Sequence, residues 1–320
     1  MTTSLAVRPL VPTLSELPPP PAHKTGWPWT AESSRLADRT AQGALWPRLT
    51  IVMPSYNQAE FLEAAIRSVL LQGYPNLEFI LVDGGSTDGS LQIIDQYRAW
   101  LSYAVSEPDD GQYSAINKGF SRSTGEVMTW LNSDDMCAPN CLWAVGGIFA
   151  ELGHTVQWIT GIPAMWDRDG NLGLVLTRPN LHRQLLRLGA YDGLTLNFIQ
   201  QEGTFWSRDL WQRAGGQLDS SLALAADYEL WCRLAEHAQL YGASVVLAGS
   251  RRHSEQKTAH SMRMYMAEMD ACRTVRPWGW TERHWLFRGI KRRLERVMSR
   301  SDRANSRVLY DPGQACWTIR

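Results

Sequence analysis

Residues 127–135 have the sequence VMTWLNSDD, in which an apolar run ends in two aspartates. The apolar run predicts a buried strand, and the aspartates then lie at the carboxyl edge of a sheet. Ligands of open α/β sheets bind at that edge. Carboxylate oxygens there suit Mg²⁺ or Mn²⁺, and such an ion can bridge to a phosphate. An ordinary Asp-rich turn that opens the next helix is the competing interpretation.

Two earlier segments show the same change from apolar strand to polar turn. Residues 49–53 predict a buried strand that Pro54 breaks, and apolar residues at helical spacing follow from 61 to 70. Residues 77–82 predict a second strand, which ends in the turn DGGSTD at 83–88. The two glycines of this turn let the backbone approach a ligand closely. Because neither G-x-G-x-x-G nor a Gly-Lys-Ser/Thr ending is present, the Rossmann and P-loop motifs are excluded.

A third polar segment precedes a helix start. Residues 106–112 have the sequence SEPDDGQ and lead into YSAINKG at 113–119. Such a loop suits contacts to a ribose or a phosphate, although a solvated loop before a surface helix explains it as well. Strand and helix signals alternate from residue 48 to about 250. The predicted fold class is therefore α/β, with a mostly parallel central sheet and helices on both faces.

The composition fits one catalytic domain with extensions. The chain has 320 residues, of which 44% are hydrophobic, and a formal net charge of zero. No apolar run approaches the roughly 18 residues that a membrane span needs, and no signal-peptide core is visible, so we expect a cytoplasmic protein. The five cysteines include no C-x-x-C pair, which argues against a disulfide framework or a zinc site.

The two ends of the chain differ from its middle. Residues 1–47 are rich in Pro, Ser and Thr and are predicted to be partly disordered, without a packed core, although their tryptophans offer anchors. Residues 48–250 form the predicted catalytic domain. Residues 251–320 contain 16 Lys or Arg and 7 Asp or Glu, a local balance of +9, and predict a basic helical extension.

Residues 284–300 of that extension predict an amphipathic helix. Leu286, Ile290 and Leu294 share one face, while Lys291 and neighbouring arginines lie elsewhere. Such a helix can lie on an anionic membrane as a peripheral contact, or it can pack its apolar stripe on the catalytic domain. Aromatic and basic residues interleave too sparsely here to predict nucleic-acid binding.

Together these segments resemble the family 2 glycosyltransferases of the bacterial type, which have the GT-A fold. The resemblance extends from about residue 48 to residue 260 and rests on five motifs in the expected order: PSYN at 54–57, VDGGSTD at 82–88, NKG at 117–119, WLNSDD at 130–135 and ADYELW at 226–231. The Gln-x-x-Arg-Trp motif of processive synthases is absent. The resemblance therefore implies a non-processive enzyme that adds one sugar per encounter.

The resemblance also implies which residues bind each part of the substrates. The nucleotide sugar would contact five residues: Pro54, Tyr56, Asp83, Asn117 and Asn132. The metal ion, Mn²⁺ or Mg²⁺, would be held by Asp134, Asp135 and His253. The acceptor would contact Glu202 and Trp206, and Asp227 would be the catalytic base, with Glu229 as the substitute candidate.

Three positions depart from the family pattern. Gly84 stands where a second aspartate is frequent, Asn132 where an Asp-x-Asp motif begins, and Ala226 where an acid precedes the base. Other candidates have ordinary structural explanations: Tyr56 can cap the sheet, and Asp227 can cap a helix. The histidine and the acceptor residues can likewise be common surface or core side chains.

The implied reaction is an inverting, metal-dependent transfer of a sugar from a nucleoside-diphosphate sugar, with UDP the default, to a hydroxyl of a glycan or lipid-linked glycan. Asp227 would take the hydroxyl proton as the oxygen attacks the anomeric carbon. A role in surface polysaccharide biosynthesis rests on family analogy alone. The competing functions are a non-catalytic nucleotide- or glycan-binding module, a retaining transferase and a nucleotidyltransferase, although the Gly-rich basic loop of the last is missing.

Overall fold

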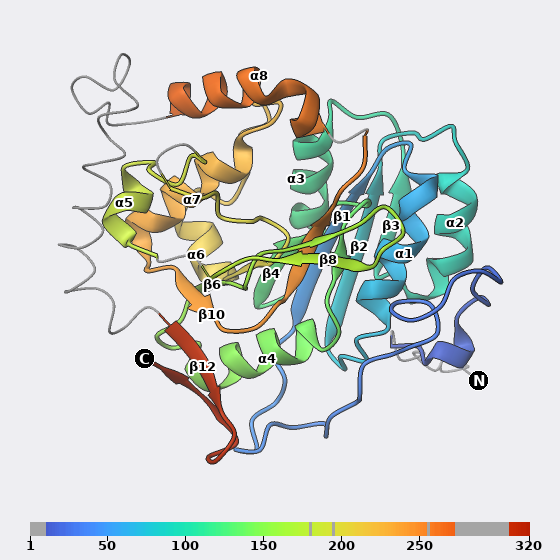
Figure 1. Cartoon of the computed structure of the whole chain (residues 1–320), viewed down its shortest axis with the longest axis horizontal. Helices are drawn as coiled ribbons and strands as arrows, with labels where there is room; N and C mark the ends of the chain where they lie inside the picture. The colour runs from blue at the N-terminus through green and yellow to red at the C-terminus, as the bar shows by residue number, and fades with distance from the viewer. Residues whose placement is uncertain (1–10, 179–180, 194–195, 255–256, 273–306) are drawn as a thin grey trace, which may run out of the picture.

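The computed structural model describes residues 11–178, 181–193, 196–254, 257–272 and 307–320. These residues form a nine-stranded sheet in the order β13-β12-β10-β6-β9-β4-β1-β2-β3, and a four-stranded sheet in the order β5-β11-β7-β8. Figure 1 shows helices on both sides of the larger sheet. The described chain thus has the layered α/β architecture that the sequence predicts.

The strands of the larger sheet are β1 (Leu49–Ser55), β2 (Leu77–Asp83), β3 (Tyr103–Ser106), β4 (Val127–Trp130), β6 (Trp158–Thr160), β9 (Thr204–Ser207), β10 (Tyr241–Ala243), β12 (Arg307–Asp311) and β13 (Cys316–Ile319). Those of the smaller sheet are β5 (Met136–Cys137), β7 (Ala164–Trp166), β8 (Leu172–Val175) and β11 (Ala248–Arg251). The α-helices are α1 (Ala59–Leu70), α2 (Ser90–Tyr97), α3 (Gln112–Arg122), α4 (Cys141–Leu152), α5 (Arg183–Arg187), α6 (Arg208–Arg213), α7 (Ala226–His237) and α8 (Lys257–Cys272). Short 3₁₀ turns are η1 (Leu14–Glu16) and η2 (Arg98–Trp100).

Strands β1 and β2 are buried along their whole length, which explains their unbroken apolar sequences. On one face of β1, Ile51 and Met53 pack with residues of α1 and α4. On the other face, Val52 packs with residues of α3 and α7. Strand β1 pairs in parallel with both β2 and β4. The polar residues that follow these three strands therefore lie at one edge of the sheet.

The sheet becomes mixed beyond β4. Strand β9 runs antiparallel to both β4 and β6, whereas β10 is parallel to β6 and to β12. The antiparallel strand brings the chain from Gln200 to Trp206 beside the end of β4. Because β9 lies between β4 and β6, residues of the second half of the domain lie next to the acidic turn at 132–135.

The tryptophan anchors expected in the N-terminal segment are present, since Trp29 and Trp46 are buried against the catalytic domain. The expectation that residues 11–47 have no packed core is wrong around these anchors. Arg67 of α1 is fully buried, and its guanidinium donates hydrogen bonds to the backbone carbonyls of Pro18, Pro28 and Trp29. Trp29 itself is 7% exposed. A buried arginine needs acceptors for its donors, and the carbonyls of this Pro-rich segment supply them.

The C-terminal prediction is also wrong in part. Helix α8 agrees with it, but residues 307–319 form the hairpin β12–β13, which pairs in parallel with β10 and extends the main sheet. Trp317 packs closely on α4, since a Cβ added to Gly147 would lie 2.7 Å from its Nε1. The domain boundary predicted at 250 therefore does not hold, because the last strands complete the sheet.

The predicted amphipathic helix at 284–300 lies outside the described residues. Within the part of the chain that the structure describes, no helix is both long and apolar enough to cross a membrane.

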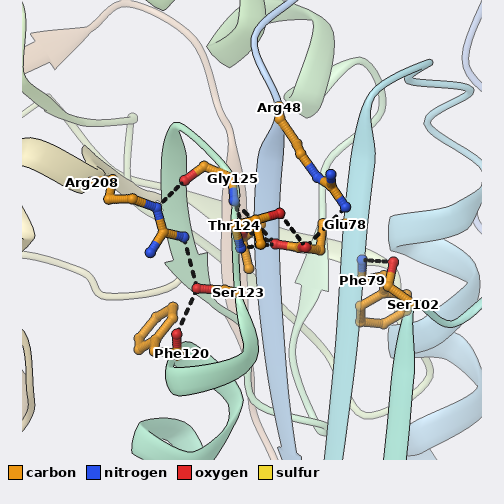
Figure 2. Close-up of polar contacts among 10 residues, drawn as sticks. Arg48, Glu78, Phe79, Ser102, Phe120, Ser123, Thr124, Gly125 and Arg208 are labelled. Carbon is orange, nitrogen blue, oxygen red and sulfur yellow. Dashed lines mark hydrogen bonds and ion pairs between the residues drawn. The ribbon is translucent and has the colours of Figure 1, made fainter.

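A polar cluster joins the amino ends of the central strands, at the edge opposite the acidic turn (Figure 2). Glu78 of β2 is 4% exposed. Its carboxylate accepts hydrogen bonds from Thr50 Oγ1 (2.6 Å), from the Thr124 backbone N–H (2.7 Å) and from Arg48 Nη2 (3.0 Å). Burial raises the pKa of Glu78, but these hydrogen bonds and the Arg48 charge outweigh it and hold the pKa below its usual range.

We expect Glu78→Gln to lower the free energy of unfolding at pH 7 by about 3 kcal/mol. The glutamine amide replaces a carboxylate oxygen with an N–H donor, so some of the buried donors around it lose their acceptor. A carboxyl whose pKa is lowered by folding stabilises the protein above its unfolded pKa, and this contribution is lost as the pH falls through the folded pKa. The deficit of the variant should therefore shrink in acid. Urea unfolding at pH 7 and at pH 4 measures it.

Asp95→Asn is the matched control, because Asp95 forms an exposed ion pair with Arg98. Its effect should stay within about 0.5 kcal/mol. Equal unfolding free energies for the two variants at pH 7 would contradict the role assigned to Glu78.

Candidate functional site

The candidate site lies at the carboxyl edge of β1, β2 and β4. Tyr56 follows β1 and is 63% exposed, whereas Pro54 is buried inside the strand. Tyr56 thus presents its ring to solvent at the edge where a nucleotide is expected. Pro54 shapes the end of β1 and offers no exposed side chain to a ligand.

Asp83 organises the turn after β2. It is fully buried, and its carboxylate accepts hydrogen bonds from the backbone N–H groups of Gly85 (3.1 Å) and Ser86 (2.9 Å). The hydroxyls of Ser86 (2.6 Å) and Ser106 (2.7 Å) donate to it as well. With both oxygens occupied and no exposed surface, Asp83 holds the turn together. The predicted contact between Asp83 and a base or ribose is therefore wrong.

The next residue, Gly84, leaves room for an acid from another loop. A Cβ added to Gly84 would lie 3.0 Å from Oδ2 of Asp109. Oδ1 of Asp109 accepts a hydrogen bond from the Gly111 backbone N–H at 2.8 Å, which fixes the carboxylate. Asp109 was not among the predicted site residues. The signal for it was the missing second aspartate at position 84, opposite an acidic loop.

Asn132 and Asp135 hold the acidic turn in shape. Asn132 Nδ2 donates to Asp135 Oδ2 at 3.1 Å, and Gln112 Nε2 donates to Asn132 Oδ1 at 2.7 Å. Asp135 Oδ1 accepts from the backbone N–H of Arg251 at 2.8 Å. Burial, together with the charges of Asp134 and Glu202, raises the pKa of Asp135. Asp135 therefore links the turn after β4 to strand β11.

The side chains of Asp134 and His253 are in contact at the same edge of the sheet. Its Oδ2 lies 3.0 Å from His253 Nε2, and the histidine side chain is only 1% exposed. The imidazole packs on the Phe61 ring at 4.5 Å between centroids, so its orientation is fixed. Arg251 Nε donates to the backbone carbonyl of Asp134 at 2.8 Å.

A carboxylate oxygen beside an imidazole nitrogen suits a divalent cation such as Mn²⁺. Among the residues that the structure describes, no group of three or more His, Cys, Asp or Glu side chains is arranged to hold a metal ion. Asp134 and His253 meet as predicted, but the oxygens of Asp135 face Asn132 and Arg251 instead. The prediction of Asp135 as a third ligand is therefore wrong for this arrangement.

Asp227 lies in the first turn of α7, half-buried. Its Oδ1 accepts a hydrogen bond from the Tyr228 backbone N–H at 2.8 Å. Burial raises the pKa of Asp227 to about 6, although that hydrogen bond and the hydroxyl of Tyr265 act in the opposite direction. A carboxylate with a pKa near the working pH suits a general base.

Glu202 interacts electrostatically with two groups of the candidate site. Burial, together with the charges of Asp134 and Asp227, raises the pKa of Glu202 to about 7. Glu202 thus lies within electrostatic reach of both the Asp134–His253 pair and the candidate base. It follows Gln201, whose Nε2 donates to the carbonyl of Trp130 at the end of β4 (2.7 Å).

The predicted acceptor contact of Trp206 is wrong, whereas the predicted contact of the partly exposed Asn117 with the nucleotide sugar stays a prediction. Trp206 is fully buried in β9, stacks on Trp211 and packs edge-on against Trp130, so it cannot stack on an acceptor sugar. The Asn117 amide donates to the carbonyl of Leu218 (2.9 Å) and accepts from its N–H (2.8 Å), which ties α3 to the segment before α7.

Glu229, the substitute candidate for the base, forms an ion pair with Arg233 one turn along α7 at 2.6 Å. This pair occupies its carboxylate and leaves Asp227 as the base candidate of α7.

In a comparison with known protein families, residues 50–198 match the profile of glycosyl transferase family 2. An uncharacterized glycosyltransferase of Rickettsia bellii is 31% identical over 221 residues, covering 66% of this chain and 31% of that protein. The chain therefore spans about a third of the length of this curated relative.

Two solved structures share the fold. Crystalline S. aureus TarS 1-349 in complex with UDP-GlcNAc has a TM-score of 0.53 at 16% identity, covering 67% of this chain and 61% of that one. Mannosyltransferase PcManGT from Pyrobaculum calidifontis, in complex with GDP-Man and Mn²⁺, has a TM-score of 0.50 at 19% identity, covering 78% of this chain and 66% of that one. At these identities the likeness shows the fold alone, and it confirms the predicted GT-A class.

Proposed function

Because this chain belongs to glycosyltransferase family 2, we propose that it transfers a sugar from a nucleoside-diphosphate sugar to a hydroxyl of a glycan or lipid-linked glycan. The observation that carries this proposal is the placement of three groups. The Asp134–His253 pair and the partly exposed Asp227 both lie within electrostatic reach of Glu202, so the three groups are candidates for one site.

Asp227 acts as the general base in this proposal. Its carboxylate removes the proton from the acceptor hydroxyl as the oxygen attacks the anomeric carbon, and the carbon–oxygen bond to the diphosphate breaks. A single displacement of this kind inverts the anomeric configuration. The site contributes mainly by orienting the two substrates and by its electrostatic environment.

Asp134 and His253 are the residues that would hold a divalent cation, Mn²⁺ or Mg²⁺. Their oxygen and nitrogen donors converge within 3.0 Å and fit such an ion. Bound there, the cation supplies charge neutralisation for the departing nucleoside diphosphate. The Mn²⁺ in the complex of the archaeal mannosyltransferase supports this assignment by analogy.

The finer points of the proposal rest on the family resemblance. They are a UDP-sugar as the default donor, a single sugar added per encounter, a role in surface polysaccharide biosynthesis and a cytoplasmic site of action. Peripheral contact with an anionic membrane belongs with them, since the segment 284–300 that would make it lies outside the described residues.

Nucleotide release from UDP-, GDP-, dTDP- and CMP-sugars, with Mn²⁺ or Mg²⁺, tests the proposed function. Slow hydrolysis of one donor that stops on chelation would support a metal-dependent transferase and identify the donor. No turnover of any donor, together with no calorimetric binding of UDP or GDP, would contradict the proposal and favour a non-catalytic module.

We expect Tyr56→Ala to raise the donor KM about tenfold to a hundredfold, because stacking of a base on an aromatic ring contributes about 1–3 kcal/mol. Stability should change little, since Tyr56 is 63% exposed. Steady-state kinetics of donor hydrolysis measure the effect. Tyr310→Ala, at a 51% exposed tyrosine on β12, is the matched control and should leave KM as in the wild type. An unchanged KM for both variants would assign Tyr56 to capping the sheet.

A further inference from the structure

A carboxylate of helix α8 holds the backbone segment that leads into α7. Figure 1 shows α8 beside α7. The cap residue of α7 is Ala225, whose side chain cannot accept a hydrogen bond. The carboxylate of Glu268 on α8 accepts from the backbone N–H groups of Ala223, Leu224 and Ala225, each at 2.9 Å.

The amino end of a helix has backbone N–H groups that need partners from outside the helix. The first N–H groups of a helix have no partner within the helix, and the aligned peptide dipoles place partial positive charge there. A side chain within the segment normally satisfies them, as Ser207 does for α6. In α7, whose first turn carries Asp227, the N–H groups of Ala226 and Tyr228 donate to Tyr113 and Asp227. Glu268 instead binds the N–H of the cap residue and of the two residues before it.

Tyr265 lies one turn before Glu268 on the same face of α8. It is 7% exposed and packs in a cluster with Ala225, Tyr228 and Met269. Its hydroxyl interacts with the Asp227 carboxylate and favours the ionised form. The ring also contacts Phe198 edge-on, at 5.5 Å between centroids, which fixes its direction.

Helix α3 holds the same segment as well. Tyr113 Oη donates to the Leu224 carbonyl at 2.6 Å and accepts from the Ala226 N–H at 3.3 Å. The backbone before Asp227 is thus held both by Tyr113 and by Glu268. Such double support limits movement of the carboxylate relative to the strand edge.

We propose that Glu268 and Tyr265 are positioning residues for Asp227, so that helix α8 forms part of the active site although it lies outside the segment matched by the family profile. The proposal rests on the proposed function, in which Asp227 is the base. Glu268 fixes the backbone that carries Asp227, and Tyr265 sets the environment of its carboxylate.

The charged and titratable groups around Asp227 determine the expected pH effects. They are Tyr265 from α8, Tyr113 from α3 and Glu202 from the chain before β9. Because the Tyr265 hydroxyl lowers the pKa of Asp227, Tyr265→Phe should move the acidic limb of the kcat profile to higher pH. Glu268→Ala removes a negative charge from the surroundings of Asp227, so it should not move the acidic limb of the kcat profile to higher pH.

The test compares kcat, donor KM and the pH profile of nucleotide release for Tyr265→Phe and Glu268→Ala. We expect Glu268→Ala to lower kcat about tenfold to a hundredfold with donor KM within about twofold, because misplacement of a catalytic group by about 1 Å has effects of that size. Tyr265→Phe should approach the wild-type kcat at alkaline pH. Tyr310→Phe on β12 and Glu236→Ala, an exposed acid at the far end of α7, are the matched controls.

Amide hydrogen exchange of residues 223–226 separates positioning from mere stability. Faster exchange in Glu268→Ala together with a lower kcat supports the proposal. Faster exchange with unchanged kcat and pH profile in both variants overturns it and leaves Glu268 with a structural role only. If the wild type turns over no donor, the proposed function fails and the positioning role fails with it, whereas turnover by all variants alike overturns the positioning role alone.

Discussion

Asp227→Asn lowers kcat for sugar transfer by about 10²- to 10⁴-fold, the size expected when a general base is removed. The amide keeps the shape of the side chain, and its oxygen can still accept from the Tyr228 N–H that now bonds Asp227. Donor KM should therefore stay near the wild-type value. Asp209→Asn, at a mostly exposed aspartate of α6, is the matched control and should retain full activity. Activity of Asp227→Asn within threefold of the wild type would contradict the role of the base.

The same variant should be more stable than the wild type at neutral pH. Burial raises the pKa of Asp227 to about 6, so the folded protein resists its ionisation. A raised carboxyl pKa destabilises the fold as the pH rises from the unfolded pKa to the folded one, after which the penalty is constant. Asp227→Asn should thus gain about 1–3 kcal/mol above pH 6 and nothing below about pH 4. Urea unfolding at both pH values measures the difference.

The raised pKa also predicts the pH dependence of catalysis. The base works in its ionised form, so kcat of the wild type should rise with pH through about 6 and then level off. A kcat that falls as the pH rises over this range would mean that a protonated group, and not the Asp227 carboxylate, is needed for catalysis.

Asp134→Ala should lower metal-dependent turnover by about 10²- to 10³-fold, the size seen when charge stabilisation of a leaving group is lost. His253→Ala should act in the same direction, because the two side chains converge within 3.0 Å. Nucleotide release measured over a range of Mn²⁺ concentrations distinguishes weaker metal binding from slower chemistry. Asp209→Asn again serves as the control, and unchanged metal dependence in Asp134→Ala would overturn the assignment.

The central part of the fold could be predicted because its signals are local. The apolar runs of β1, β2 and β4 each end in polar residues, and these runs are buried in the structure as expected. The pairing of Asp134 with His253, which are far apart in the chain, followed from the family resemblance rather than from any local pattern.

The errors have a common physical origin in contacts over long sequence distances. The Pro-rich segment looked unable to form a core, but the buried Arg67 supplies donors that its carbonyls satisfy. Trp206 looked like a sugar-stacking residue, but an antiparallel strand carries it into a cluster of tryptophans. Asp83 looked like a ligand, and hydrogen bonds from Ser86 and Ser106 turn it into the centre of its own loop.

Two further residues escaped prediction for the same reason. The carboxylate of Asp109 fills the space beside Gly84, and Glu268 binds the backbone that leads into a helix more than forty positions earlier in the chain. The glycine at position 84 was a sequence signal for Asp109, whereas Glu268 has no local signature, since an acidic helix residue is common on protein surfaces.

The measurement that tests the account most directly is calorimetric titration of UDP and GDP, with and without Mn²⁺, into the wild type, Asp134→Ala and Asp227→Asn. One nucleotide should bind the wild type and Asp227→Asn with similar affinity in the presence of Mn²⁺, and Asp134→Ala should lose most of this binding. Equal, metal-independent binding by all three proteins, or loss of binding in Asp227→Asn alone, would contradict the division of the site into a diphosphate end at Asp134 and a base at Asp227.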